Sequence, residues 1–215
     1  MAGLKTLHLD LPASTEDLRK LELGTVVYLR GRVFTAREGV YKRAVEEGAG
    51  MPAGPDALGR VNFHCSPAAT INPDGSHTVG AVPATASFRF AKWLDGWFKL
   101  SGCNIIIGKG GMTGEVYRRS FVPNEAIYLT TVGYGTGALL GRGIKAVAGV
   151  YWLEELGLAQ AVWVLDVEKL RTIPCRERSC RQQPVRARER QDRARAWQAL
   201  RRHAASDDAA LRRDR

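Results

Sequence analysis

The sequence predicts an α/β protein built around one central sheet. Segments rich in β-branched and aromatic residues alternate along residues 1–172 with segments in which apolar residues recur every three or four positions. Hydrophobic residues make up 45% of the 215-residue chain, which is enough for a sizeable core. These observations favour one domain over residues 1–172, followed by an extension over residues 173–215.

The expected elements follow from local patterns and turn signals. Expected strands span residues 4–11, 25–37 (one strand or two), 61–65, 103–110, 126–135 and 159–170. Expected helices span residues 14–24, 38–48, 87–102 and 112–120, with one or two more over 138–157. Glycine and proline mark residues 49–60 as a loop and residues 71–77 as a turn.

The positive charge is concentrated at one end of the chain. The net charge is +10, but residues 173–215 contain thirteen Arg, no Lys and six acidic residues, and so carry +7. The remaining 172 residues are close to neutral. The sequence therefore predicts a near-neutral body with a basic tail rather than a basic domain.

The four cysteines do not predict a metal site. Cys65, Cys103, Cys175 and Cys180 form no Cys-x-x-Cys pair and have no histidine cluster near them. We expect buried, reduced thiols. The N-terminal residues lack a basic stretch followed by an apolar one, and no apolar run is long enough to span a bilayer, so we expect a cytoplasmic protein without a membrane segment.

The stretch "IIIGKGGM" (105–112) looks like a strand that leads into a phosphate-binding loop. A P-loop needs Ser or Thr after its lysine, but Gly110 follows Lys109, so we reject a nucleotide-binding P-loop. A strand end followed by Gly-Lys-Gly-Gly still exposes backbone N–H groups beside a cation, which suits a carboxylate as well as a phosphate. The simpler alternative is a turn with a solvated lysine.

Two other segments carry cations and hydroxyls where a strand is expected to end or a helix to begin. Arg37 lies in "GRVFTAREGVYKR" (31–43), and Thr85, Ser87 and Arg89 lie in "VPATASFRFA" (82–91). In an α/β sheet, segments that follow parallel strands can meet at one edge of the sheet, so these two segments can lie beside the loop of Lys109. Their chemistry predicts a site for a small dianion such as a dicarboxylate.

Five segments together resemble a known family. "GRVFTAREGVYKR", "PATASFRF", "IIIGKGGM", "YLTTVGYG" and "ELGLAQAVWVLDVEKL" occur in the order found in the β part of iron–sulfur hydro-lyases. That family contains the C-terminal domain of class I fumarate hydratase and the β subunit of L-tartrate dehydratase. The resemblance covers roughly residues 20–170.

The resemblance implies a fold, a partner and a reaction. The fold would be a swivelling β/β/α domain with a central mixed sheet flanked by helices. The partner would be an α subunit, and the two chains would form a hetero-oligomer. Cysteines of the α subunit would hold a [4Fe–4S] cluster, which would act as a Lewis acid on the substrate. The reaction would be reversible hydration of a C4 dicarboxylate of the fumarate/malate or tartrate type. Because the β-type motifs begin near residue 20, we expect the α part to be a separate chain.

The resemblance also implies site residues. Thr85 matches the threonine proposed as the base, and Arg37, Arg89 and Lys109 match the cations that bind the carboxylates. Ser87 and Tyr134 are further candidates for lining the site. No residue of this chain is expected to bind metal.

The chain departs from the family pattern around these residues. A second threonine is replaced by Ala86, an aspartate by Glu38, a frequent histidine by Tyr41, and another aspartate by Ala91. These changes bear on the identity of the substrate more than on the class of reaction. Ala86, Tyr41 and Ala91 also motivate the alternative function, a non-catalytic relative that acts as a binding or regulatory subunit.

Structural roles are the alternatives for single residues. Thr85 can cap a helix, and Arg37 and Arg89 can form surface salt bridges. We expect the adjacent His64 and Cys65 to pack in the core, since neighbours on a strand point to opposite faces. In the helix expected at 87–102, Phe88, Trp93, Leu94, Trp97 and Leu100 recur at helical spacing, and we assign this stripe to the core.

Residues 173–215 allow three interpretations. We expect disorder, because the segment is rich in arginine and lacks a hydrophobic period. A nucleic-acid-binding arm is a weaker alternative, since such arms usually contain Lys as well as Arg. The third is a frameshift near Pro174: one back-translation of "RQQPVRARERQDRARAWQAL" with a base dropped gives "GNSLFARANAKIARALGKPF", which is similar to the family's C-terminal segment.

Overall fold

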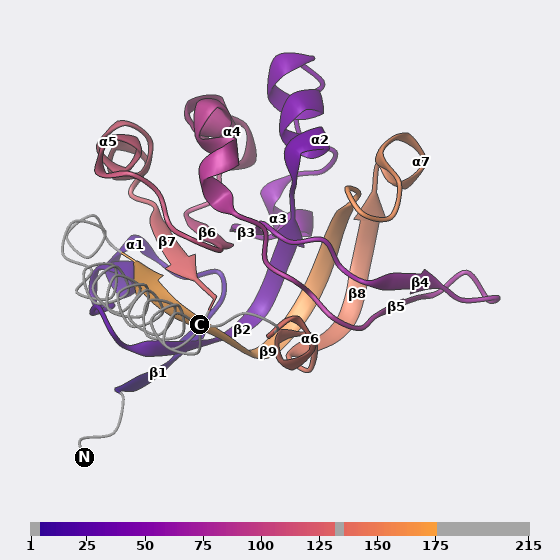
Figure 1. The fold of residues 1–215 in the computed structure, drawn as a ribbon, viewed down its shortest axis with the longest axis horizontal. Coiled ribbons are helices and arrows are strands. Elements are labelled where there is room, and N and C mark those ends of the chain that lie inside the picture. Colours follow the sequence, from indigo (N-terminus) through magenta and orange to yellow (C-terminus); the bar gives the residue numbers. More distant parts are fainter. Residues whose placement is uncertain (1–4, 132–135, 176–215) are drawn as a thin grey trace, which may run out of the picture. The chain divides into compact units, whose positions relative to one another are not determined.

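The computed structural model describes residues 5–131 and 136–175 of the chain (Figure 1). The described residues all fall within one compact unit. Tyr134 and the predictions for residues 176–215 lie outside the described residues.

The fold contains one mixed sheet of seven strands. Its order is β1 (Thr6–Asp10), β2 (Val26–Thr35), β3 (Val61–Phe63), β6 (Ile105–Gly108), β7 (Ile127–Thr130), β9 (Val162–Cys175) and β8 (Ile144–Tyr151). The first five strands are parallel to one another, and β9 runs antiparallel to β7 and β8. The predicted α/β class with a central mixed sheet is confirmed.

The long strand β9 closes part of the sheet into a ring. One edge of β9 pairs antiparallel with β2, from Val27↔Thr172 to Phe34↔Val164, with an irregularity between Leu29 and Gly31. Its C-terminal residues also pair with β7, from Thr130↔Ile173 to Tyr128↔Cys175. The strands β2, β3, β6, β7 and β9 therefore form a closed series of pairings, which leaves β1 and β8 outside the ring.

Alternate side chains of the ring strands build two apolar cores. In β6, Ile105 and Ile107 belong to one buried cluster and Ile106 to the other, as the two-residue period of a strand requires. Helices cover the Ile106 face: α2 (Glu38–Tyr41), η1 (Lys42–Glu46), α4 (Leu94–Ser101) and η3 (Tyr117–Phe121) all contribute to its cluster. Figure 1 shows α2, α4 and α5 (Gly114–Val116) on the same side of the sheet.

The remaining elements are short. They are α1 (Thr15–Arg19), α3 (Pro55–Leu58), the hairpin β4 (Ala69–Ile71) and β5 (His77–Val79), the 3₁₀ helices η2 (Ser87–Trp93) and η4 (Val122–Asn124), α6 (Gly137–Gly141) and α7 (Leu153–Leu156). The helix expected at 14–24 begins where predicted, because Ser14 caps α1 in a capping box that Asp17 completes, but α1 ends at Arg19 instead of reaching Gly24. The loop expected at 49–60 contains α3, which Pro55 opens at its first turn.

The prediction of one or two helices over residues 138–157 is confirmed at the two ends, where α6 and α7 lie, and is wrong in between. The middle of this segment forms the strand β8, which pairs with β9 from Ile144↔Val167 to Tyr151↔Val162. Backbone pairing with the long strand β9 outweighs the local helical period, because strand preference depends on the neighbouring strands.

The apolar stripe expected at 87–102 is only partly buried. Trp93, Leu94 and Trp97 are buried as predicted, but Phe88 is 64% exposed and Leu100 is 44% exposed. Residues 87–93 form a 3₁₀ helix with three residues per turn, so Phe88 does not share the face that a continuous α-helix would give it. In the part of the chain described here, no helix combines the length and the apolar character needed to cross a bilayer.

Candidate active site

Two of the predicted site segments, those of Arg37 and Lys109, follow parallel strands at the same edge of the sheet, and His64, which was expected to pack in the core, follows a third. Arg37 lies two residues after β2, His64 directly after β3, and Lys109 directly after β6. Because β2, β3 and β6 are parallel neighbours, their carboxyl ends lie side by side.

The segment that carries Thr85 lies between the ends of β3 and β6. Ala84 forms an antiparallel bridge with Cys65, and Ala86 forms a parallel bridge with Lys109. The Thr85 N–H donates to the carbonyl of His64 at 2.6 Å, and the Lys109 N–H donates to the carbonyl of Thr85 at 3.1 Å. A backbone hydrogen bond thus joins Thr85 directly to Lys109.

Thr85 is partly buried and is not a helix cap. The 3₁₀ helix η2 begins at Ser87, its N-cap position is Ala86, and no side chain caps it. The helix-cap alternative for Thr85 is therefore wrong. Within the described residues, no group forms a hydrogen bond with the Thr85 hydroxyl, so this hydroxyl is not committed to holding the fold.

Arg89 is held by a carboxylate. Its Nη2 donates to Oε2 of Glu38 at 2.9 Å, and the two side chains are 49% and 57% exposed. The salt-bridge alternative for Arg89 therefore fits this structure. Exposed pairs of this kind contribute about 0–1 kcal/mol, so a ligand carboxylate can replace Glu38 at small cost.

Arg37 lies at the start of α2 and is half-buried. Its Nη1 donates to the carbonyl of Ala159 at 3.3 Å, while its buried Nε finds no hydrogen-bond partner among residues 5–131 and 136–175. No described acidic side chain forms an ion pair with Arg37, so the described part of the chain does not support the salt-bridge alternative for Arg37. A buried donor without a partner costs about 1–3 kcal/mol, and an acceptor from a ligand would relieve that cost.

Lys109 is exposed and begins a glycine turn. Gly110 and Gly111 follow it with φ angles of 89° and 78°, in the left-handed region that favours glycine. Lys109 therefore lies directly before a glycine pair at the end of β6, where its backbone is bridged to Ala86.

A buried polar network lies beneath these residues, and the sequence did not predict it. The His64 ring lies between two hydroxyls: Nδ1 is 2.8 Å from Ser87 Oγ, and Nε2 is 2.7 Å from the Tyr41 hydroxyl. The Tyr128 hydroxyl donates to Ser87 Oγ at 2.8 Å, and the amide of Asn62 lies 2.8 Å from the Tyr41 hydroxyl. All five side chains are buried.

Gly108 makes room for this network. A Cβ at Gly108 would overlap Ser87 Oγ and would lie 2.8 Å from the Tyr128 hydroxyl. The last residue of β6 therefore lacks a side chain for a structural reason, and the glycine before Lys109 is part of the same site.

Burial sets the protonation of these groups. Burial lowers the pKa of His64 to about 3, so its imidazole is neutral near pH 7. Burial also raises the pKa of Tyr41 well above its usual value, which keeps that phenol protonated. The network is therefore uncharged, and its hydrogen bonds join neutral groups.

His64 and Cys65 point in different directions, as expected for neighbours at a strand end. Cys65 packs in the cluster that contains Ile105 and Ile107, which agrees with the predicted core packing. His64 contacts Tyr41 and Phe90 on the opposite side, so core packing describes His64 only in part. In the sequence, the one sign of the network was His64, a polar residue that directly follows a buried strand.

The described cysteines do not suit an iron–sulfur cluster. In residues 5–131 and 136–175, no three His, Cys, Asp or Glu side chains form a group that could hold a metal ion. Cys65 and Cys103 are buried free thiols. Burial raises the pKa of both, that of Cys103 to about 11, and for Cys65 the charge of Arg37 opposes part of the shift.

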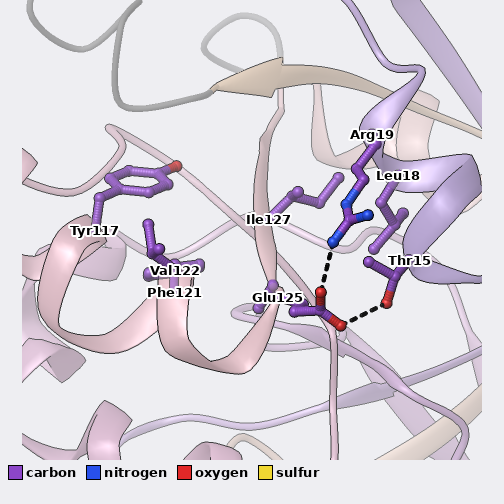
Figure 2. Close-up of a pocket in the computed structure, with 9 residues that line it drawn as sticks. Thr15, Leu18, Arg19, Tyr117, Phe121, Val122, Glu125 and Ile127 are labelled. Carbon is purple, nitrogen blue, oxygen red and sulfur yellow. Dashed lines mark hydrogen bonds and ion pairs between the residues drawn. The ribbon is translucent and has the colours of Figure 1, made fainter.

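Two pockets lie away from this site. One, of about 310 Å³, lies between α1 and the η3–η4 segment, where Glu125 accepts hydrogen bonds from Arg19 at 2.7 Å and Thr15 at 3.2 Å (Figure 2). The other, of about 570 Å³, is lined by Arg30, Arg60 and Lys145 among others. Neither is lined by Thr85, Lys109 or the two arginines of the predicted site.

Comparison with known proteins finds similarity to tartrate dehydratase subunits and to a fumarate hydratase. The chain is 33% identical over 153 residues to the putative L(+)-tartrate dehydratase subunit beta of Methanocaldococcus jannaschii, which covers 71% of this chain and 77% of that protein. It is 28% identical over 161 residues to the L(+)-tartrate dehydratase subunit beta of Escherichia coli K12, at 75% and 77% coverage. It is 29% identical over 164 residues to the putative fumarate hydratase class I of Geobacillus stearothermophilus, covering 76% of this chain and 30% of that protein.

The family assignment follows from a match over most of the described chain. Residues 2–175 match the family described as Fumarase C-terminus, and β9 ends at the same residue, Cys175. The resemblance seen in the five sequence segments is thereby confirmed. The chain belongs to the family of fumarate hydratase C-terminal domains and L-tartrate dehydratase β subunits.

Proposed function

We propose that this chain is the β subunit of an iron–sulfur hydro-lyase that hydrates and dehydrates a C4 dicarboxylate of the fumarate/malate or tartrate type. One observation carries the proposal. Thr85 and Lys109 lie on hydrogen-bonded backbone at the strand ends, in a chain that belongs to this family.

Three cations are proposed to bind the substrate carboxylates. Arg37 offers a buried Nε for which the described residues provide no hydrogen-bond partner, Arg89 offers a guanidinium that pairs with an exposed carboxylate, and Lys109 offers an exposed ammonium directly before a glycine pair. A guanidinium can bind a carboxylate through two parallel hydrogen bonds, which fixes the orientation of the substrate as well as its position.

Thr85 is proposed to move the proton. In dehydration its Oγ would take a proton from the substrate carbon, and in hydration it would return that proton. A threonine hydroxyl is a poor base in water, so its alkoxide form needs nearby positive charge, which Arg89 and Lys109 would supply. A hydroxyl without a hydrogen-bond partner in the described chain is available for this role.

The partner and the cofactor are part of the same proposal. The described residues of this chain do not form a cluster site, so we assign the [4Fe–4S] cluster to an α subunit in a hetero-oligomer. Bound there, the cluster would supply a Lewis acid for the substrate hydroxyl.

The proposal is tested by anaerobic reconstitution. The full chain is co-expressed with an iron–sulfur α subunit of this family, the cluster is rebuilt, and hydration of fumarate and mesaconate and dehydration of tartrate are followed. We expect turnover that needs both chains and is lost in Lys109→Ala. Lys99→Ala, which removes an exposed lysine of α4, is the matched control and should keep full activity.

A non-catalytic relative is the second candidate, favoured by the Glu38 carboxylate on Arg89 and by Ala86 in place of a threonine. A soluble, cluster-loaded complex without turnover would support it. Calorimetric titration of that complex with the same dicarboxylates then shows whether the site still binds them.

A further inference from the structure

The proposed reaction leaves the buried network of Asn62, Tyr41, His64, Ser87 and Tyr128 without a role. These residues come from different parts of the chain: His64 follows β3, Tyr41 belongs to α2, Ser87 begins η2, and Tyr128 lies in β7. The network therefore ties together the elements that carry the candidate active site.

We propose that His64 is a positioning residue that, through Ser87, fixes where Thr85 and Lys109 stand. This inference rests on the proposed function for its catalytic consequence, but its structural content can be tested without any activity. It assigns a role to a histidine that would otherwise be a packing residue.

The His64 ring cannot turn freely. It packs in a T-shaped arrangement with Phe90, with 4.7 Å between ring centroids at 72°, and with Tyr41, with 5.6 Å between centroids at 67°. The Tyr41 hydroxyl adds a hydrogen bond at Nε2. Packing and hydrogen bonding together thus hold Nδ1 toward Ser87.

The hydrogen bonds also select one tautomer. The Asn62 amide is best satisfied when its oxygen accepts from the backbone N–H of Phe63 and Ala36, at 3.1 and 3.2 Å. Its nitrogen then donates to the Tyr41 hydroxyl at 2.8 Å and to His64 Nε2 at 3.1 Å. Nε2 must therefore accept, so the proton of the neutral ring is on Nδ1, where it is donated to Ser87 Oγ.

Ser87 transmits this constraint to the site. Its side chain occupies the space beside Gly108, and its N–H donates to the carbonyl of Lys109 at 3.1 Å. Lys109 in turn donates its N–H to the carbonyl of Thr85. A shift of Ser87 would therefore move both Thr85 and Lys109, and displacements of about 1 Å can cost about a hundredfold in rate.

A matched pair of variants separates positioning from packing. The amide of Asn in His64→Asn can reach the place of Nδ1 and donate to Ser87, whereas the amide of Gln in His64→Gln can reach the place of Nε2 and contact only Tyr41 and Asn62. In the reconstituted complex, we expect His64→Gln to lower kcat by about ten- to a hundredfold with little change in KM. We expect His64→Asn to keep most of the activity. Equal kcat losses in both variants would overturn the positioning role.

Two measurements on the full chain alone keep this test independent of turnover. Long-range ¹H–¹⁵N correlation spectra should show the His64 proton on Nδ1 in the wild type, and a proton on Nε2 would contradict the inference. Amide hydrogen exchange should become faster at Ser87 and Lys109 in His64→Gln and Ser87→Ala but not at the pairs between β2 and β9. Unchanged exchange at Ser87 and Lys109 in these variants would overturn the inference even if the complex is active. A wild-type complex without turnover would count against the proposed function alone.

Discussion

The Ser87 hydroxyl lies 2.8 Å from Nδ1 of His64, in space that exists because Gly108 has no side chain. This contact joins the start of η2 to the ends of β3 and β6. It places a buried, neutral network directly under the loop that carries Lys109.

Gly108→Ala should destabilise the protein. The added methyl group would overlap Ser87 Oγ inside a packed core, and overpacking of this kind costs about 1–3 kcal/mol. Gly80→Ala is the control, because a Cβ there meets only the Ala68 carbonyl oxygen, at an ordinary 3.7 Å. Chemical denaturation measures both variants, and equal free energies of unfolding would show that the space around Ser87 is not restricted.

His64 should make the stability of the protein depend on pH. The folded chain keeps His64 neutral down to its pKa of about 3, whereas an unfolded histidine takes up a proton below about pH 6.5. Lowering the pH between these values therefore protonates the unfolded chain alone and reduces the free energy of unfolding, by up to about 1.4 kcal/mol per pH unit.

Denaturation of the wild type and of His64→Gln between pH 4 and 7 measures this contribution as a difference, because the carboxylates are common to both. The wild type should lose more free energy of unfolding than the variant as the pH falls. Parallel curves for the two proteins would mean that His64 is protonated equally in both states.

Glu38→Gln should strengthen substrate binding. The substitution removes the carboxylate that now pairs with Arg89 at 2.9 Å and so frees this guanidinium for the substrate. Stability should change by less than about 1 kcal/mol, since the pair is exposed. The KM for the active dicarboxylate is the measurement. Glu16→Gln, which alters an exposed carboxylate of α1, serves as the control, and a higher KM in Glu38→Gln would show that Glu38 helps the substrate to bind.

Much of the sheet could be predicted because its strands carry strong local signals. The run Ile105–Ile107 followed by glycine predicted both β6 and its end, and the pattern of residues 14–24 predicted the start of α1 at Ser14. The strand β8 could not be predicted in this way, because its conformation depends on pairing with β9, which lies beyond it in the sequence.

The candidate site was predicted in part for a similar reason. Residues at strand ends, such as Arg37 and Lys109, could be found from motifs and from the topology of parallel strands. The contact of His64 with Ser87 joins residues 23 positions apart, and the partner Tyr128 lies another 41 positions on. Nothing in the local sequence indicates that these side chains meet, so the network emerges only from the fold.

The most direct test of the account is the kcat of Thr85→Ala in the reconstituted complex, beside Thr85→Ser. Thr85 does not cap η2, and its hydroxyl holds no described group, so both variants should fold with wild-type stability. We predict that Thr85→Ala falls below about a tenth of the wild-type kcat, because it removes the proposed base, and that Thr85→Ser keeps more activity, because it retains the hydroxyl. A Thr85→Ala complex that keeps more than about a tenth of the wild-type kcat would contradict the central claim that this hydroxyl moves the proton.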